Sequence, residues 1–474
     1  MSDQRNHRLL TNTIWFAIGN FGSRILSFLL VPLYTGILLP EEYGKIDLIT
    51  TTVNLSIPLL SLSICDAVFR FSMDSSDCKD EVFTEGITIS LLSSILSLSL
   101  YPVLKALLPS IIEYWWYFWL LFTTMTIANT MTMFLQGLEK TRILAFQGMV
   151  YTFTFSILNV ILLVIVHIGI YGYLISQISA NVISILFMVL RGKLYDNFHI
   201  KSFNCSHLRQ MLKYSIPLIF SSIAWWIMSS IDKYMILYMC GEKYNGLYAV
   251  AHKIPSLVTV FTSFFVSAWQ ISAVTTKDDS DSVKYFRSVY TNLFAFSAVL
   301  SFLVIIFNKL ISHVLFLGDF FQAWTMVPCL IAASLFSTLS MLLGAQFTAY
   351  KKSSLHLTSN VIAMVSNAFF NFICIHLWGP VGVTIGTMLS YLLMLLYRQY
   401  KVRQIMNDKE CISHICISFL IIVIAVILPA FDLKFWISCD VILFVLFLRL
   451  NNKSIMNICK FLLGMTQKRR VKND

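Results

Sequence analysis

The chain is built mainly from apolar stretches that are long enough to cross a lipid bilayer. A spanning helix needs about 20 predominantly apolar residues, because each residue advances the helix by about 1.5 Å through a hydrocarbon core about 30 Å thick. Hydropathy along the sequence predicts fourteen such helices. Their expected ranges are 9–38, 44–65, 84–107, 113–136, 143–166, 170–190, 214–240, 246–274, 288–311, 321–349, 354–377, 380–397, 411–430 and 434–450. The sequence therefore predicts an all-α integral membrane protein.

Composition agrees with a membrane protein. Of the 474 residues, 57% are hydrophobic and 12% are charged, whereas globular domains carry about 25% charged residues. The first apolar stretch is too long for a cleavable signal peptide, and no small-residue cleavage site follows it. The ten cysteines are scattered, without a CxxC pair or a metal-ligand spacing. We therefore expect neither a disulfide framework nor a metal site.

The distribution of the basic residues predicts the orientation of the chain. If the N-terminus is cytoplasmic, 27 of the 35 Lys and Arg residues lie on the cytoplasmic side of the predicted helices. Five lie on the other side: Lys45, Lys105, Lys243, Lys309 and Lys434. This bias follows the positive-inside rule and predicts that both termini are cytoplasmic. The net charge of +11 is then explained by the bilayer as partner, and no nucleic acid partner is expected.

The predicted helices form two similar halves. LPEEYGKIDL after the first helix has a counterpart in CGEKYNGLYAV after the seventh, and QGLEKTRILAF after the fourth matches AYKKSSLHL after the tenth. Six helices is an even number, so the repeat is parallel, as in many alternating-access transporters. The expected parts are an N-terminal lobe (1–190), a cytoplasmic interfacial linker (191–213), a C-terminal lobe (214–400), two additional helices (401–450) and a basic cytoplasmic tail (451–474).

The first predicted helix carries a charge near its middle. From a start near Leu9, Arg24 lies roughly 22 Å along the helix axis, which is deep in the bilayer. Asn20, Arg24 and Ser27 are spaced i, i+4 and i+7, so they share one helical face. A face with a buried guanidinium is expected to line protein or a water-filled cavity rather than lipid.

The seventh predicted helix has a polar face of its own. Ser222, Trp225, Ser229 and Asp232 recur at i, i+3, i+7 and i+10. Lys233 follows directly, and Lys253 lies in the eighth helix.

Charges inside a membrane often mark a substrate or ion pathway. On this interpretation Arg24, Lys233 and Lys253 line a central cationic cavity that suits an anionic, phosphate-bearing substrate. The alternative is structural: Arg24 and Lys233 pair with Asp232, or with Asp47 in the second helix, and hold the two halves together.

Two further polar residues lie at the expected cytoplasmic end of the second helix. Asp66 and Arg70 are spaced i, i+4 and are either gate residues or a solvated pair at a helix end. No GxSxG, Walker A or HExxH pattern is present and the histidines do not cluster. We expect no catalytic residues, no metal and no ATP-driven step.

Several segments, taken in order, resemble one family. They are NTIWFAIGNFGSRILSFLLVPLYTGILLPEEYGKIDL, DAVFRF, LKYSIPLIFSSIAWWIMSSIDKYMI followed by GLYAVAHKIP, and the pair Trp269–Gln270. The chain resembles Wzx-type polysaccharide flippases of the multidrug/oligosaccharidyl-lipid/polysaccharide (MOP) exporter superfamily, which also contains MurJ and the MATE exporters. The resemblance implies two six-helix lobes around a cationic cavity in a bacterial plasma (inner) membrane. It further implies translocation of undecaprenyl-diphosphate-linked oligosaccharide repeat units for a surface polysaccharide such as O-antigen (lipopolysaccharide) or capsule.

The resemblance also suggests roles for single residues. Arg24 matches an arginine that the lipid-linked-oligosaccharide branch carries in its first helix, and Asp232–Lys233 match an acid–base pair typical of the seventh. The cavity-lining candidates are Asn20, Ser27, Ser222, Trp225, Ser229, Trp269 and Gln270.

No cofactor is expected. The driving force is either the membrane potential or a coupled H⁺ or Na⁺ on Asp232 or Asp47. A polysaccharide polymerase and chain-length machinery are the implied protein partners.

Two other functions fit the same helices less well. A MATE-like, ion-coupled exporter of small molecules would favour cationic substrates and an acidic cavity, whereas three cations are predicted inside this membrane domain. A membrane glycan polymerase or ligase would need a sizeable external loop for its catalytic residues, and no predicted external loop is long enough. We therefore expect a transporter and not an enzyme.

Overall fold

The structure is a computed structural model that describes residues 26, 28–74, 78–199, 202–275, 281–350, 352–407 and 413–456. These residues form helices and connecting turns, with no β-strand among them. The chain divides into two compact units, Met1–Ser230 and Ile231–Asp474. The boundary between them falls within helix α10 (Cys205–Cys240). The prediction of an all-α membrane protein is confirmed.

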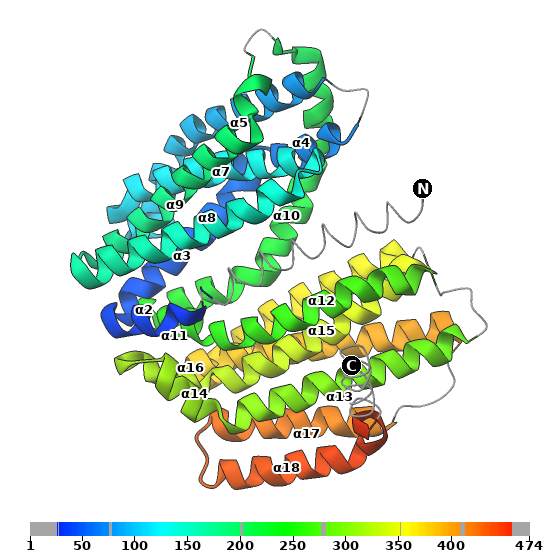
Figure 1. The fold of residues 1–474 in the computed structure, drawn as a ribbon. Helices are drawn as coiled ribbons and strands as arrows, with labels where there is room; N and C mark the ends of the chain where they lie inside the picture. The colour runs from blue at the N-terminus through cyan, green and yellow to red at the C-terminus, as the bar shows by residue number, and fades with distance from the viewer. Residues whose placement is uncertain are drawn as a thin grey trace, which may run out of the picture. The chain divides into compact units, whose positions relative to one another are not determined.

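The first unit is a bundle of helices around α7 (Figure 1). Its α-helices before α10 are α2 (Val31–Ile37), α3 (Pro40–Leu60), α4 (Ile64–Ser72), α5 (Lys79–Ser97), α6 (Tyr101–Leu107), α7 (Trp115–Gly137), α8 (Thr141–Asn159) and α9 (Gly169–Gly192). Short 3₁₀ or π segments are η1 (Leu98–Leu100), η2 (Pro109–Tyr114), η3 (Val160–Ile165) and η4 (Leu194–Asn197). Helix α7 contacts α3, α4, α5, α8 and α9. The core of the unit includes Val68, Phe83 and Phe134, with the two phenylalanine rings 4.7 Å apart.

The second predicted span is bent rather than straight. Helix α3 ends at Leu60, and α4 continues at an angle of 63°. The backbone of Leu62 and Ser63 lies in the left-handed region, with φ of 55° and 50°. Neither residue is a glycine or an asparagine, the types that favour this conformation. The predicted range 44–65 runs across the bend. Pro58, which lies in α3 shortly before the bend, is a residue that permits a kink, but it does not predict the angle.

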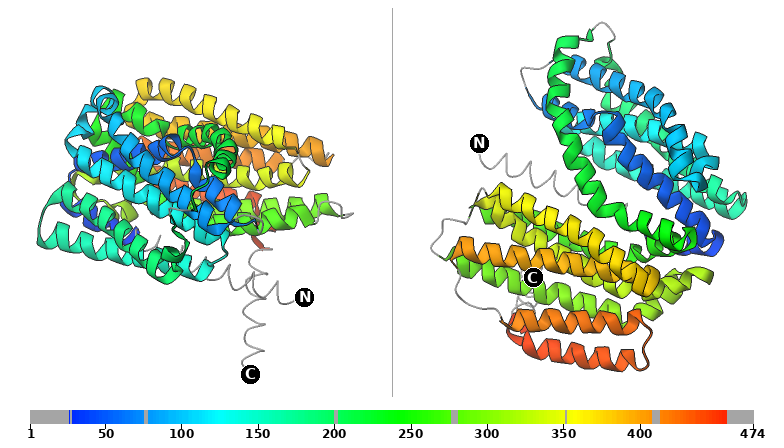
Figure 2. Two further views of the ribbon diagram at one scale, coloured as in Figure 1. Left: turned by 90° about the horizontal axis from the view of Figure 1, so that it is seen from above. Right: turned by 180° about the vertical axis from the view of Figure 1, so that it is seen from behind.

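The second unit is centred on α15. Its helices after α10 are α11 (Glu242–Ala251), α12 (Lys253–Thr275), α13 (Ser282–Ile306), α14 (Asn308–Leu315), η6 (Gly318–Thr325), α15 (Val327–Ala349), α16 (Ser353–Met406), α17 (Ser413–Ala430) and α18 (Trp436–Leu450). Helix α15 packs against α12, α13, α16 and α17 (Figure 1), and most of its surface is buried. Helices α17 and α18 lie side by side at the edge of this unit (Figure 2).

Helix α16 consists of two antiparallel arms. Its helical geometry breaks at Trp378 (φ −132°, ψ 15°) and Gly379 (φ 58°, ψ −142°). Beyond this turn, hydrogen bonds join Asn367 to Thr387, and Ser359 to Arg398. Each arm is as long as a membrane span. The predicted join between the eleventh and twelfth helices coincides with this turn, but the second arm continues to Met406 instead of ending near 397.

Seven described helices are long and apolar enough to cross a membrane, or nine if two bent pairs each count as one span. Helix α16 counts once in that number, although it has two arms. The predicted total of fourteen is compatible with this arrangement and stays a prediction.

The two arms of α16 approach so closely that one glycine has no room for a side chain. A Cβ added at Gly386 would lie 2.7 Å from the backbone nitrogen of Asn371 and would clash with its Oδ1. Alanine is the better helix former by about 1 kcal/mol, so propensity alone predicts that Gly386→Ala stabilises the protein. We expect the opposite, a loss of about 1–3 kcal/mol in the free energy of unfolding, because the arms must separate.

Thermal unfolding of the purified protein measures this effect. Thr358→Ala, at an exposed position on the same helix, is the matched control and should change stability by no more than about 0.5 kcal/mol. A Gly386→Ala variant as stable as the wild type would contradict the close packing of the arms.

Candidate functional site

A buried carboxylate, Asp232 of α10, centres a polar cluster in the second unit. Its side chain is 5% exposed. The Tyr248 hydroxyl of α11 donates a hydrogen bond of 2.5 Å to Asp232 Oδ2, and the Thr387 hydroxyl of α16 donates one of 3.2 Å to the same oxygen. Within the described residues, Asp232 Oδ1 has no hydrogen-bond partner. Burying a carboxylate oxygen without a partner is unfavourable, so this oxygen is positioned to receive a proton or a cation.

The two arms of α16 supply the other members of the cluster. Asn367 Nδ2 donates to Thr387 Oγ1 at 3.3 Å, and Asn371 Nδ2 donates to Asn367 Oδ1 at 3.2 Å. Thr387 Oγ1 also lies 3.4 Å from Asn371 Oδ1. A hydroxyl has one proton, so Thr387 cannot donate to Asp232 and to Asn371 at once. When Thr387 donates to Asp232, Asn371 Oδ1 is left open together with Asp232 Oδ1, and two open oxygens suit H⁺ or a hard cation such as Na⁺.

Both predicted lysines lie near this cluster in the sequence. Lys233 follows Asp232 on α10 and is half-buried. Lys253 is also half-buried, but it is the first residue of α12. The predicted eighth span is thus divided at His252, whose ring lies edge-on to Tyr248 at 4.6 Å. Lys253 stands at this break instead of inside a continuous helix.

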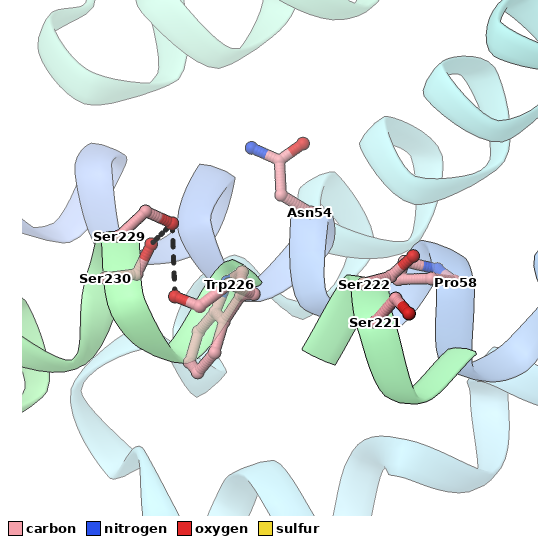
Figure 3. A pocket seen from close by; sticks show the side chains of 7 residues that line it. All are labelled: Asn54, Pro58, Ser221, Ser222, Trp226, Ser229 and Ser230. Carbon is pink, nitrogen blue, oxygen red and sulfur yellow. Dashed lines mark hydrogen bonds between the residues drawn. The ribbon is translucent and has the colours of Figure 1, made fainter. Parts of the chain in front are cut away.

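A second polar site lies in the first unit, where α3 and α10 line a pocket of about 500 Å³ (Figure 3). Its lining residues are Asn54, Pro58, Ser221, Ser222, Trp226, Ser229 and Ser230. The Trp226 indole donates a 3.0 Å hydrogen bond to the Thr51 carbonyl, which fixes the ring. Because Pro58 has no amide hydrogen, the carbonyl of Asn54 lacks its usual partner within the helix. Hydroxyls, an amide and an indole are groups that bind sugars.

The predicted residues Ser222 and Ser229 both line this pocket. Trp226 lines it as well; it is one of the deep tryptophans that could line a cavity, although it does not share the predicted polar face of Ser222 and Ser229. Its neighbour Trp225 was predicted to line a cavity, and the Trp225 side chain lies outside what the structure describes. The spacing of polar residues cannot predict which of two adjacent tryptophans lines a pocket when the helix bends near them, as α10 does by 43°.

Other predicted residues are spread over the two units. Asp47 is half-buried in α3, and Asp66 is exposed on α4. Arg70 pairs with Asp74 at 4.0 Å, not with Asp66 as expected. Trp269 is 4% exposed and packs against Tyr285 and Phe286 of α13. The gate role of Asp66 and Arg70 and the cavity-lining role of Trp269 stay predictions.

Some predicted residues lie outside the described part of the chain. They are Asn20, Arg24, Ser27 and the side chain of Gln270. The diphosphate role of Arg24 therefore rests on its sequence position.

A buried arginine was missed by the sequence reasoning. Arg398 was assigned to the cytoplasmic surface because the twelfth helix was expected to end at 397. It is 3% exposed, and its guanidinium donates to Ser340 O at 2.7 Å, Asn360 Oδ1 at 2.7 Å and Ser359 Oγ at 2.9 Å. Arg398 is thus a buried cation in addition to the three that the sequence places within predicted spans. The guanidinium packs against Gly344, where an added Cβ would lie 2.7 Å from Nη1.

The first turn of α10 and the residue before it are attached to α5 by polar contacts. Glu85 is fully buried. Its carboxylate accepts a hydrogen bond of 2.8 Å from His207 Nδ1 and one of 3.2 Å from the backbone amide of Asn204. The ligand atoms of Glu81, Glu85 and His207 lie within 4.8 Å of one another. These three residues could hold a metal ion by their spacing, and the hydrogen bond between Glu85 and His207 accounts for the closeness of these two.

Comparison with solved structures identifies the fold. The lipid II flippase MurJ in an inward closed conformation matches with a TM-score of 0.67 at 15% identity, covering 95% of this chain and all of that one. An inward-facing multidrug MATE transporter of the MOP superfamily matches with a TM-score of 0.66 at 14% identity, covering 83% of this chain and all of that one. The fold is therefore that of the MOP-superfamily transporters.

The sequence narrows the class to one family. Residues 9–271 match the polysaccharide biosynthesis protein family, and the chain belongs to that family. An uncharacterised membrane protein of Methanocaldococcus jannaschii is 20% identical over 431 residues, which cover 84% of this chain and 98% of that one. A probable low-salt glycan biosynthesis flippase of Haloferax volcanii is 24% identical over 189 residues, 39% of each chain. The resemblance seen in the sequence is confirmed.

Arg398 gives a direct test of the second unit. A lysine keeps the charge but cannot reach three acceptors in a fixed fork. We expect Arg398→Lys to lower the free energy of unfolding by about 2 kcal/mol, because buried acceptors lose their donors. Thermal unfolding measures the loss, with the exposed Arg449→Lys as the matched control. Equal stability of the two variants would contradict a structural role for Arg398.

Proposed function

We propose that this protein is a flippase that moves an undecaprenyl-diphosphate-linked oligosaccharide from the inner to the outer leaflet of a bacterial plasma membrane. The observation that carries the proposal is membership of the polysaccharide biosynthesis family in a chain with a MOP-type fold. The relative from Haloferax volcanii, described as a probable glycan biosynthesis flippase, supports the same substrate class. Both termini are cytoplasmic in this proposal, and a polysaccharide polymerase with its chain-length machinery receives the product.

The charged part of the substrate is assigned to the three predicted cations. Arg24 binds one phosphate through its two-pronged guanidinium, and Lys233 and Lys253 act as point charges on the diphosphate. The half-buried state of both lysines supports this role, because partial removal from water strengthens their attraction for an anion. The prenyl chain stays in the lipid.

The glycan is assigned to the pocket between α3 and α10. Its serine hydroxyls and the Asn54 amide offer donors and acceptors to sugar hydroxyls, and the fixed Trp226 indole offers an apolar face. These contacts recognise sugars in general rather than one sugar, which suits a transporter that moves a repeat unit as a whole.

The driving ion is assigned to Asp232. Its spare oxygen Oδ1 and the surrounding amide and hydroxyl oxygens of Asn371 and Thr387 are hard ligands of the kind that Na⁺ prefers, and the carboxylate can instead take H⁺. Binding of either ion removes an unsatisfied buried charge. The membrane potential adds about 2.3 kcal/mol per charge per 100 mV to the outward movement of an anion.

A MATE-like exporter of small molecules is the second candidate, favoured by the match to a multidrug MATE structure. Drug-resistance profiling of a deletion strain separates the two: an exporter protects cells from cationic drugs, whereas a flippase does not.

Arg24 tests the diphosphate site. We expect Arg24→Ala to lower export of the surface glycan by about 10-fold or more, because a charge-assisted hydrogen bond contributes about 1.5–3 kcal/mol. Lipid-linked repeat units should accumulate on the inner side, as measured by extraction and chromatography. Arg24→Lys should retain part of the export, and the exposed Arg449→Ala should retain all of it. Normal export by Arg24→Ala would exclude this residue from the substrate site.

Asp232 tests the coupling ion. In vesicles, transport by the wild type should respond to an imposed Na⁺ or pH gradient, and transport by Asp232→Asn should not, because the amide carries no charge to neutralise. Asp319→Asn is the matched control, since Asp319 is an exposed acid of the same unit that pairs with Lys243. A gradient response that survives in Asp232→Asn would remove this residue from the coupling mechanism.

A further inference from the structure

Away from both sites described above, the first unit has a pocket of about 370 Å³ with an unusual combination of side chains. It is lined by Arg142, Ile143 and Phe146 of α8 and by Phe187 and Arg191 of α9. Arg142 and Arg191 are both exposed. Neither has an ion-pair partner in the described part of the chain. The pocket thus places two available guanidinium groups beside two aromatic rings.

Two hydrogen bonds fix the helices on either side of this pocket. Lys140 Nζ donates to the Gly192 carbonyl at 3.0 Å, just beyond the arginines. Gln147 Nε2 donates to Ser184 Oγ at 2.6 Å on the other side, where Ser184 is fully buried. The pocket therefore lies between two hydrogen bonds that join α8 and its preceding residue to α9. These bonds fix the distance between the pocket walls without a ligand.

The charge of Arg142 does not stabilise the helix to which it belongs. It lies in the first turn of α8, where the helix macrodipole disfavours a cation. Arg191 lies in the last turn of α9, where a cation is favoured. An anion bound between the two arginines would offset the unfavourable interaction of Arg142 with the helix macrodipole.

Exposed apolar side chains continue from the pocket along both helices. On α8, Phe146, Phe153 and Ile157 are spaced i, i+7 and i+11 on one face and are 49–60% exposed. On α9, Ile183 and Leu190 flank Phe187 on its own face and are 41% and 67% exposed. In a membrane protein such a surface faces acyl chains. The arginines stand at the end of it that the charge distribution predicts to be cytoplasmic.

We propose that this pocket binds an anionic phospholipid of the cytoplasmic leaflet, such as phosphatidylglycerol or cardiolipin. The lipid phosphate lies between Arg142 and Arg191, and an acyl chain lies along the apolar face of α8 and α9. Charge complementarity and the continuous apolar face favour a lipid over free phosphate, which would use only the arginines. The site is independent of the flippase proposal, because it lies outside the residues assigned to the transported substrate.

Native mass spectrometry of the full-length protein in detergent tests this site. Phosphatidylglycerol added to the delipidated wild type should give bound adducts, and phosphatidylcholine should give about 10-fold fewer. The R142Q/R191Q variant should lose this preference. R142K/R191K should keep most of it, which shows that loss in the glutamine variant is not misfolding. R209Q/K213Q, which removes two exposed cations at another helix end of the same unit, should keep all of it.

Four results would overturn the proposal. They are equal binding of the two phospholipids by the wild type, an unchanged preference in R142Q/R191Q, an equal loss in R209Q/K213Q, and displacement of the adducts by millimolar inorganic phosphate. Undecaprenyl diphosphate is added in a further arm. If it replaces phosphatidylglycerol at stoichiometric amounts in the wild type but not in R142Q/R191Q, the pocket belongs to the transported substrate and the phospholipid assignment is wrong.

Discussion

The hydrocarbon interior of a bilayer offers no hydrogen bonds, so each polar group placed there needs a partner within the protein. Helices satisfy the backbone, and many buried hydroxyls return to a carbonyl of their own helix, as Ser56 does to Thr52 O and Ser90 to Gly86 O. Charged groups cannot be satisfied in this way. Asp232 and Arg398, both buried in the second unit, therefore carry most information about how this unit works.

Helix α16 contributes to the surroundings of both charged groups, but the two groups differ in how many hydrogen-bond partners they have. Arg398 has three good acceptors from α15 and α16 and holds the arms of α16 against α15. Among the described residues, Asp232 lacks a partner for Oδ1, and its other oxygen accepts from both Tyr248 and Thr387. A satisfied group stabilises one structure, whereas an unsatisfied group changes its energy when an ion binds. We therefore interpret Arg398 as structural and Asp232 as the ion-responsive group.

Most of the fold could be predicted, because apolar length and the position of charges determine where a helix crosses a membrane. The family could be predicted from motifs in order. Two features were missed for local reasons. No glycine marks the bend at Leu62–Ser63. Arg398 was expected at the cytoplasmic surface because hydropathy predicted that its helix ends at 397, before the observed end. Periodicity placed Ser222, Ser229 and Asp232 on one polar face, and the structure divides them between the pocket of the first unit and the Asp232 cluster. Periodicity could not find Asn367, Asn371 or Thr387, which reach Asp232 only through the hairpin of α16.

The proposed movement of a diphosphate-linked glycan lipid between leaflets can be measured with the purified protein. Reconstitution of the purified protein into liposomes with a fluorescent undecaprenyl-diphosphate oligosaccharide tests it most directly, by measuring how much of the label becomes accessible to a quencher that cannot cross the membrane. The proposed function predicts transfer that depends on the protein and is faster than in empty liposomes. Transfer no faster than in empty liposomes, in a preparation that transports a cationic drug, would contradict it.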